Sequence, residues 1–180
     1  MTTQSSSDLD AVIRRKDRAV TDEQWIIDLL NRAPFGVMAT VWEERPFTVA
    51  RNFAYDRDKH AIYLHGGVKG RTYDNIQANN QVCLNVSEMG RLLPGPRAMN
   101  FSVEYAGVVI FGRAFVVTDA DEAKHGLQLI VDKHFPHLQP NQDYEPAADV
   151  DLKVTAVYRI DIESWSGKQK KADDDFPGAF

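Results

Sequence analysis

Apolar and polar residues alternate with two different periods along this chain, which separates expected helices from expected strands. Within residues 22–32, apolar side chains recur every three or four positions, and this spacing predicts an amphipathic helix that ends before Pro34. Thr21 is the expected N-cap of that helix, and Gln24, three residues later, completes a capping box.

The chain then changes to short β-rich runs separated by polar or glycine-containing turns. These runs predict strands over residues 35–42, 47–55, 61–65, 81–87, 105–118 and 154–162. The first three are joined by tight turns, as in an antiparallel meander. Gly107 and Gly112 lie inside the longest run and indicate bulges or close backbone approach, which a barrel needs where a strand bends.

Two more helices are predicted between strands, one over about residues 71–78 and one from Asp119 or Asp121 to about His134. Stretches of weak periodicity predict loops over residues 88–100 and 136–150. Helices inserted between antiparallel strands argue against a parallel Rossmann sheet. The pattern favours a small barrel with helices at its openings.

Composition indicates one soluble domain, because 43% hydrophobic residues in a chain of 180 are too many for a disordered protein. We expect a flexible N-terminal tail over 1–13, the domain over 14–168 and a C-terminal tail over 169–180. The net charge of −5 argues against a nucleic-acid binder. Without a long apolar run or a secretory signal, we expect a cytoplasmic protein with no membrane partner.

Neither cysteine nor histidine spacing predicts a metal site. Cys83 is the single cysteine, which excludes a cysteine-based zinc site within one chain and is more typical of a small core residue than of a nucleophile. His134 and His137 with Asp132 straddle Pro136 and lack a third close ligand.

The stretch that follows the predicted strand 61–65 has the composition of an anion site. His65 ends the strand, a glycine-rich turn follows, and Lys69 and Arg71 stand where the next helix begins. Amide donors, the positive end of the helix dipole and two cations would converge there, as at a phosphate site. The motif is neither a Walker A nor a GxGxxG sequence, and an ordinary turn with solvated Lys69 and Arg71 fits it equally well.

Two other groups of residues could meet a ligand. Trp165 and Lys168 directly follow the last strand, where an indole and a cation could hold a flat aromatic molecule with an anionic tail. Trp165 could equally close the end of the barrel. The cations within residues 14–18 form either a solvated face or an anion-binding arm that reaches a cofactor or a partner subunit.

Four stretches together resemble the FMN-binding split-barrel proteins related to pyridoxamine 5′-phosphate oxidase, and among them the nitroimidazole-resistance branch. They are residues 15–39, 46–66, 105–114 and 162–168, and they occur in the expected order. The resemblance implies a mainly β fold with helices (α+β), namely a small six-stranded antiparallel split barrel with flanking helices.

The resemblance also implies a homodimer with FMN in a groove between the subunits. The cofactor-binding residues that it implies are Arg51, Asn52, Phe53, His65, Gly66, Lys69, Gly70, Arg71, Thr72, Trp165 and Lys168. The residues at 51–53 would line the isoalloxazine edge, those at 65–66 would lie beside the flavin, and those at 70–72 would cradle the phosphate.

Two positions depart from that family pattern. The phosphate motif usually reads Gly-Arg/His-Lys, whereas Thr72 occupies the lysine position here. Its hydroxyl can donate to a phosphate, and Lys69 can supply the charge. Position 51 is often proline in the branch, whereas Arg51 adds a second cation here.

The implied function is that of an FMN-dependent oxidoreductase. It would pass electrons from NADH or NADPH to a small electrophilic molecule such as a nitroaromatic. His65 is the expected catalytic residue, as a proton donor or substrate-orienting group, although it could instead close the strand by hydrogen bonding. The alternative is a non-catalytic flavin- or haem-binding protein for storage or sensing, with haem or a deazaflavin as other cofactors and His65 as the haem ligand.

Overall fold

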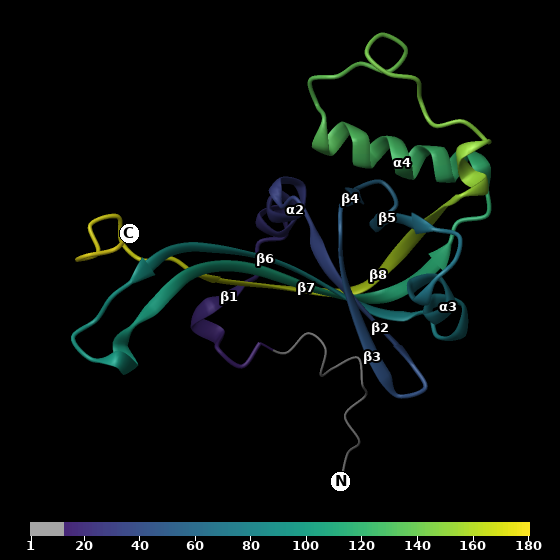
Figure 1. Cartoon of the computed structure of the whole chain (residues 1–180). Helices are drawn as coiled ribbons and strands as arrows, with labels where there is room; N and C mark the ends of the chain where they lie inside the picture. Colours follow the sequence, from purple (N-terminus) through teal and green to yellow (C-terminus); the bar gives the residue numbers. More distant parts are fainter. Residues whose placement is uncertain (1–12) are drawn as a thin grey trace.

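The computed structural model describes residues 13–180, which form one antiparallel eight-stranded sheet with three α-helices around it (Figure 1). The strand order is β3-β2-β6-β7-β8-β5-β4, and β1 pairs with β8. The sheet curls into a split barrel that does not close. The strands are β1 (Ala19–Val20), β2 (Gly36–Trp42), β3 (Arg45–Arg51), β4 (Phe53–Asp56), β5 (Ala61–Gly67), β6 (Gln81–Leu93), β7 (Ser102–Val116) and β8 (Thr155–Lys170).

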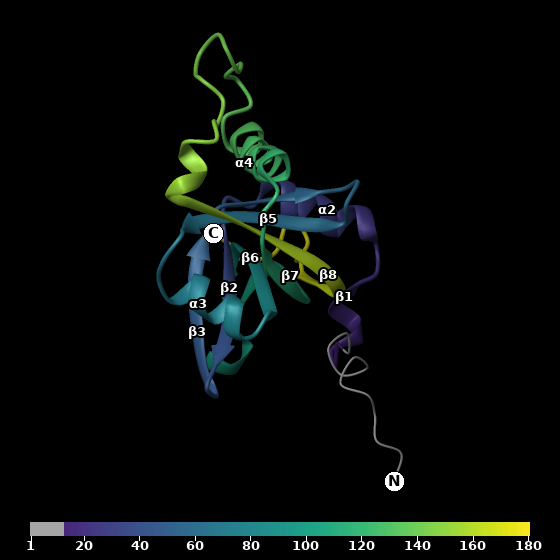
Figure 2. The ribbon, with the colours of Figure 1, turned by 90° about the vertical axis from the view of Figure 1, so that its right-hand side faces the viewer.

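The α-helices are α2 (Glu23–Arg32), α3 (Arg71–Ala78) and α4 (Ala120–His134), and all three lie where the sequence predicts them. Two views at right angles show α4 next to β5 and α3 beside β2 and β3 (Figure 2). The N-cap of α2 is Asp22 rather than Thr21, because the Asp22 carboxylate accepts hydrogen bonds from the amides of Gln24 (2.9 Å) and Trp25 (3.4 Å).

The α+β class is confirmed, but the sheet has eight strands rather than six. The predicted strand 47–55 breaks at Asn52, so that β3 pairs with β2 while β4 pairs with β5. The other additional strand, β1, is only two residues long, too short for a recognisable alternation.

The predicted loop over 88–100 is largely strand. β6 continues to Leu93 and β7 begins at Ser102, and their hairpin projects away from the barrel (Figure 1). β8 likewise extends to Lys170, so the predicted domain boundary at 168 falls inside a strand. Both faces of the projecting hairpin are largely exposed, and alternation of apolar and polar residues is therefore weak there.

The predicted N-terminal tail lies outside the described residues except for Ile13. No helix within residues 13–180 is both long and apolar enough to cross a membrane.

The bulge predicted at Gly112 is confirmed. The pairing of β7 with β8 shifts between Phe111 and Gly112, which leaves Glu163 as an extra residue on β8. A Cβ at Gly112 would lie 2.2 Å from the Asp161 carbonyl oxygen, so only glycine fits. Gly107 pairs regularly with Lys168 and marks no bulge.

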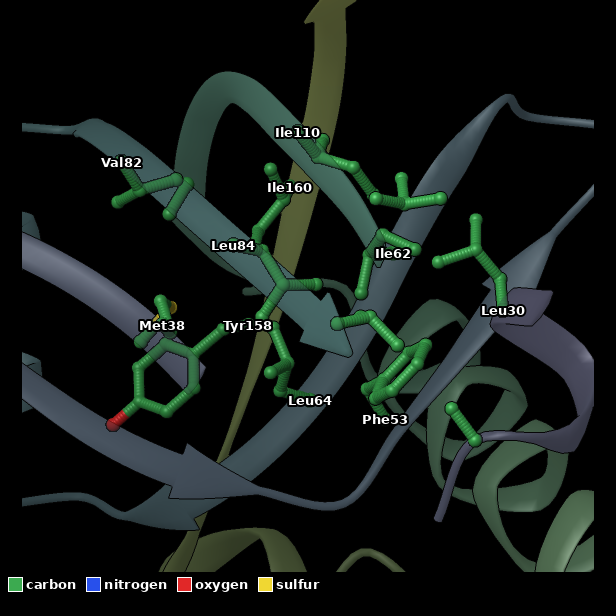
Figure 3. Close-up of a cluster of buried hydrophobic side chains, with 14 of the residues drawn as sticks. Leu30, Met38, Phe53, Ile62, Leu64, Val82, Leu84, Ile110, Tyr158 and Ile160 are labelled. Atoms are coloured by element: carbon green, nitrogen blue, oxygen red, sulfur yellow. The ribbon is translucent and has the colours of Figure 1, made fainter. Parts of the chain in front are cut away.

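The main hydrophobic core lies inside the curled sheet and under α2 (Figure 3). Leu29 and Leu30 of α2 are fully buried against it. Burial of a side chain of this size stabilises the fold by about 1.5–3 kcal/mol relative to an exposed one. The helical period of α2 therefore fixes which face of the helix closes the barrel.

A second cluster lies on the outer face of the sheet and contains Tyr63, Ala123 and Val157. α4 packs there so closely that a Cβ at Gly126 would lie 2.5 Å from Cδ1 of Tyr63. Beside this contact the Glu122 carboxylate accepts hydrogen bonds from the Tyr63 hydroxyl (2.6 Å) and the Arg159 guanidinium (2.8 Å). Helix α4 is thus held on β5 and β8 by one close contact and one ionic cluster.

We expect Gly126→Ala to destabilise the protein although alanine favours a helix. The added methyl group meets the Tyr63 ring, and overpacking costs about 1–3 kcal/mol, more than the gain of up to about 1 kcal/mol in helix propensity. Urea unfolding should show a lower midpoint. A raised midpoint would mean that α4 moves away from β5 without loss of stability.

The Glu122 cluster makes stability depend on pH. The hydrogen bonds from Tyr63 first and Arg159 second lower the pKa of Glu122 from 4.5 to about 2. Its contribution is therefore complete above pH 4.5 and is lost as pH falls toward 2. We expect wild type to exceed Glu122→Gln in unfolding free energy by about 2 kcal/mol at pH 7, with the difference shrinking below pH 4.5. A difference that is constant with pH would contradict this assignment.

Candidate functional site

Arg51 ends β3 at the open seam of the barrel, where the chain crosses to β4. Its Nη1 donates to the carbonyl oxygen of His65 on β5 (3.0 Å), and its Nη2 donates to the Thr72 hydroxyl on α3 (3.1 Å). The guanidinium therefore joins an edge strand, a strand near the opposite edge of the sheet and the first turn of a helix. Its Nε is buried and has no hydrogen-bond partner.

The glycines of the β5–α3 turn leave room for this arrangement. A Cβ at Gly66 would lie 3.0 Å from Nη1 of Arg51. Gly70 is the N-cap of α3, has a φ of 111° and provides no capping side chain. A Cβ there would meet nothing within 4 Å, so the amino end of α3 faces open space.

That helix end has the properties of an anion site. The first backbone bond of the helix runs from the Asp74 amide to the Gly70 carbonyl oxygen (3.0 Å), and the amides before it have no acceptor within the helix. Lys69 and Arg71 are exposed beside it, and the Arg71 guanidinium lies 5.4 Å from the centre of the Phe47 ring. Amide donors and the positive end of the helix dipole therefore lie beside two exposed cations.

Thr72 is only 6% exposed, and its hydroxyl faces Arg51. The cation that reaches the usual lysine position is therefore Arg51, from a different strand, whereas Lys69 points into solvent. Sequence reasoning identified both cations but could not show which one contacts Thr72.

His65 contributes its carbonyl oxygen, rather than its ring, to the Arg51 cluster. Side chains alternate along a strand, so the His65 ring and the Gly66 position lie on opposite faces of β5. The ring is exposed, but partial desolvation by nearby protein atoms, followed by the Arg51 charge, lowers its pKa from 6.5. The imidazole is therefore neutral near pH 7.

Asn52 and Phe53 occupy the crossing from β3 to β4. The exposed Asn52 side chain donates to the Pro34 carbonyl oxygen (3.0 Å). Phe53 is fully buried, and the Lys133 ammonium lies 3.5 Å from its ring centre. Burial lowers the pKa of Lys133 to about 8. Only Asn52 of these two presents a side chain to a ligand at the surface.

Trp165 and Lys168 lie on opposite faces of β8. Trp165 pairs with Ile110 on the core side, and its ring lies 4.6 Å from that of His60 and 5.7 Å from that of Tyr55. This arrangement favours its role in closing the barrel. Lys168 faces outward and lines a cavity of about 470 Å³ with Arg14, Arg15, Ser87 and Tyr105, among others.

The structure of one chain does not bring these two residues to Arg51. Gly66 pairs with Ala156, and Trp165 lies nine positions farther along β8. At a rise of ~3.3 Å per residue, this separation is about 30 Å along the strand. The predicted binding residues thus fall into two groups, one at the β5–α3 turn and one on β8.

Sequence reasoning missed the polar contacts that position α3 and the β4–β5 turn. Buried Asn75 donates to the Thr40 hydroxyl (2.8 Å) and so fixes α3 against β2. Asp56, 6% exposed, hydrogen-bonds His125 of α4 (2.8 Å). The sequence signal that could have identified these contacts is a polar residue within an otherwise apolar run. Within residues 13–180, no group of three or more His, Cys, Asp or Glu side chains could hold a metal ion.

We expect NMR titration of His65 to give a pKa below 6.5, and Arg51→Gln to raise it toward that value, because one of the two causes of the shift is removed. The His65→Asn spectrum assigns the resonance among the five histidines. An unchanged pKa in the Arg51 variant would show that the guanidinium charge does not act on the ring.

Comparisons with known proteins agree with this fold. The family model for pyridoxamine 5′-phosphate oxidase matches residues 22–169. The search of curated proteins finds no match.

Among solved structures, the flavocytochrome Anf3 from Azotobacter vinelandii is 24% identical, with a TM-score of 0.77, over 93% of this chain and 78% of the other. The FAD and haem binding protein from Mycobacterium smegmatis is 19% identical, with a TM-score of 0.76, over 87% of this chain and 76% of the other. A protein from Bacteroides thetaiotaomicron, provisionally named for 5-nitroimidazole antibiotic resistance, is 24% identical, with a TM-score of 0.69, over 84% of this chain and 86% of the other. Because the family model covers most of its length, the chain belongs to the pyridoxamine 5′-phosphate oxidase family.

Proposed function

We propose that this chain binds FMN, with the phosphate held by Arg51 and the amino end of α3, and that it is an FMN-dependent oxidoreductase. The observation that carries the proposal is the Arg51 guanidinium, which is anchored on His65 and Thr72 beside the amino end of α3, where no side chain caps the helix.

The residues at this turn fit an anionic group. The open space at Gly70 leaves the first-turn amides accessible, and Lys69 and Arg71 add positive charge around them. Arginine offers several donors in a fixed plane, which suits a phosphate. The departure at position 72 is compatible with FMN, because Arg51 supplies the charge that lysine would otherwise bring.

Bound FMN would supply two-electron chemistry, while the chain would bind and orient it. Arg51 and the amides of α3 would fix the phosphate end. The Asn52 amide, held by Pro34, lies next along the chain and would orient the ring. The neutral His65 ring can offer a hydrogen bond near pH 7 but carries no charge there.

The proposed reaction takes electrons from NADH or NADPH and passes them to a small electrophilic molecule. The likeness to the Bacteroides protein supports a nitroaromatic as that molecule. His65 would orient the acceptor or relay a proton. If His65→Ala retained FMN and full turnover, His65 would have no part in the reaction.

We also propose that the protein is a homodimer with the cofactor at the subunit interface. The two groups of predicted binding residues lie about 30 Å apart along β8. A second copy could place its Lys168 and the adjoining cavity over the Arg51 cluster. One chain alone offers the two groups only at separate places.

A haem protein is the second candidate, because two of the similar structures are described as a flavocytochrome and as an FAD and haem binding protein. The exposed His65 ring, neutral near pH 7, could serve as a ligand that would hold the haem. An absorbance spectrum of the purified protein separates the candidates, since haem gives a Soret band and oxidised flavin does not.

Arg51→Gln tests the phosphate assignment directly. We expect the dissociation constant for FMN to rise about 10- to 100-fold, the effect of losing a charge-assisted contact. Affinity for riboflavin, which lacks the phosphate, should stay nearly constant. Arg45→Gln, the same change at the far exposed end of β3, is the matched control and should bind both ligands like wild type.

Flavin fluorescence quenching gives both constants. Equal losses of FMN and riboflavin affinity in Arg51→Gln would indicate a collapsed site rather than a lost phosphate contact. Wild type that binds neither ligand would overturn the flavin proposal.

A further inference from the structure

Tyr158 of β8 is a core residue with one polar atom that leaves the core. Its side chain is 1% exposed and packs in the main apolar cluster inside the curled sheet. The hydroxyl points away from the apolar side chains around it (Figure 3). It donates to the carbonyl oxygen of Gly67 at the end of β5 (3.2 Å). Tyr158 thus joins the barrel core to the glycine-rich turn that precedes α3.

The ring of Tyr158 also lies close to the Arg51 guanidinium. A Cβ at Gly66 would lie 3.2 Å from Cε2 of Tyr158, 3.0 Å from Nη1 of Arg51 and 3.3 Å from Cζ of Arg51. Both side chains therefore pack against Gly66, which places no side chain between them. Burial raises the pKa of Tyr158, and the Arg51 charge opposes this rise. The phenol keeps its proton near pH 7 and can donate it in the hydrogen bond.

Two carbonyl oxygens at the end of β5 are thus held by side chains from two other strands. Arg51 of β3 holds the His65 carbonyl oxygen (3.0 Å), and Tyr158 of β8 holds the Gly67 carbonyl oxygen. Residues 68–70, which follow, belong to no strand or helix and lead directly into α3. The Tyr158 contact therefore lies where the strand ends and the turn begins.

Packing alone does not require a tyrosine at this position. Phenylalanine would fill the same apolar space without a hydroxyl that needs a partner, and an unpaired buried hydroxyl is costly. Within residues 13–180, the bond to the Gly67 carbonyl oxygen is the one hydrogen bond that the Tyr158 hydroxyl makes. The phenol oxygen therefore acts on the turn rather than on the core.

We propose that Tyr158 is a positioning residue for the anion site, which holds the β5–α3 turn and the Arg51 guanidinium in the geometry that receives a phosphate. The inference deepens the proposed function and rests on it, because the phosphate of FMN is the anion concerned. We assign Tyr158 no contact with the ligand. Its effect passes through the Gly67 carbonyl oxygen and through the packing against Gly66.

Tyr158→Phe tests the hydrogen bond alone, because it removes one oxygen atom and keeps the ring. A change that preserves volume and shape in this way should leave the protein folded. We expect the dissociation constant for FMN to rise about 3- to 10-fold, the effect of one hydrogen bond. Affinity for riboflavin, which lacks the phosphate, should stay nearly constant. Flavin fluorescence quenching gives both constants.

The matched control is Tyr63→Phe. Tyr63 is also fully buried, and its hydroxyl donates to the Glu122 carboxylate on the outer face of the sheet (2.6 Å). This variant should unfold at a lower urea concentration than wild type but bind FMN with unchanged affinity. Equal losses of FMN affinity in the two variants would show that Tyr158 acts only through the general stability of the barrel, and would overturn the inference.

The pKa of His65 provides a readout that needs no flavin. Desolvation first, and the Arg51 charge second, lower this pKa from 6.5. If Tyr158 holds the guanidinium in place, Tyr158→Phe should change the His65 pKa in an NMR titration. The double variant Arg51→Gln/Tyr158→Phe should then show the same pKa as Arg51→Gln alone, because the charge that the tyrosine positions is already absent.

The outcomes separate this inference from the flavin proposal. Wild type without FMN affinity would overturn the proposed function, while a changed His65 pKa in Tyr158→Phe would still support Tyr158 as the residue that positions Arg51. If the His65 pKa and the FMN affinity were both unchanged in Tyr158→Phe, the inference would be wrong and the flavin proposal would stand.

Discussion

The contact of Arg51 with the end of β5 ties together two parts of the fold that the sheet itself leaves apart. β3 and β4 are the two ends of the strand order, and the barrel is split between them. Arg51 reaches across this seam from β3 to the His65 carbonyl oxygen and to Thr72 at the start of α3. Backbone hydrogen bonds close the rest of the sheet, but here a side chain makes the connection. The candidate site therefore lies at the gap between β3 and β4, where no backbone hydrogen bonds close the barrel.

The same contact explains why the turn after β5 is rich in glycine. At Gly66 a side chain would meet the guanidinium, and at Gly70 the φ of 111° is unfavourable for other residues. A cation held this way is already desolvated and oriented, so a ligand would not need to order it. The cost is a buried Nε without an acceptor.

The helices and the glycine-rich turn after β5 could be predicted from the sequence, because they depend on residues that are close together along the chain. The period of α2, the capped start of α4 and the glycines before α3 each depend on neighbours along the chain. The break at Asn52 could not be predicted, since the β-rich run continues through it and only pairing with different strands divides it. The same holds for the choice between Lys69 and Arg51 as the cation at Thr72, which depends on how β3 and α3 meet.

That Trp165 and Lys168 lie on opposite faces of β8 could not be predicted from the sequence either, because the cause lies in the pairing with another strand. The extra residue at Glu163 shifts the alternation of β8, so that Tyr158 and Ile160 point into the core before the bulge and Trp165 and Gly167 do so after it. Without that shift Lys168 would point into the barrel, where a charged side chain is costly. Only glycine at position 112 admits the bulge, because any Cβ would meet the Asp161 carbonyl. One glycine on β7 thus decides that the indole closes the core while the lysine faces the surface on which a second molecule could lie.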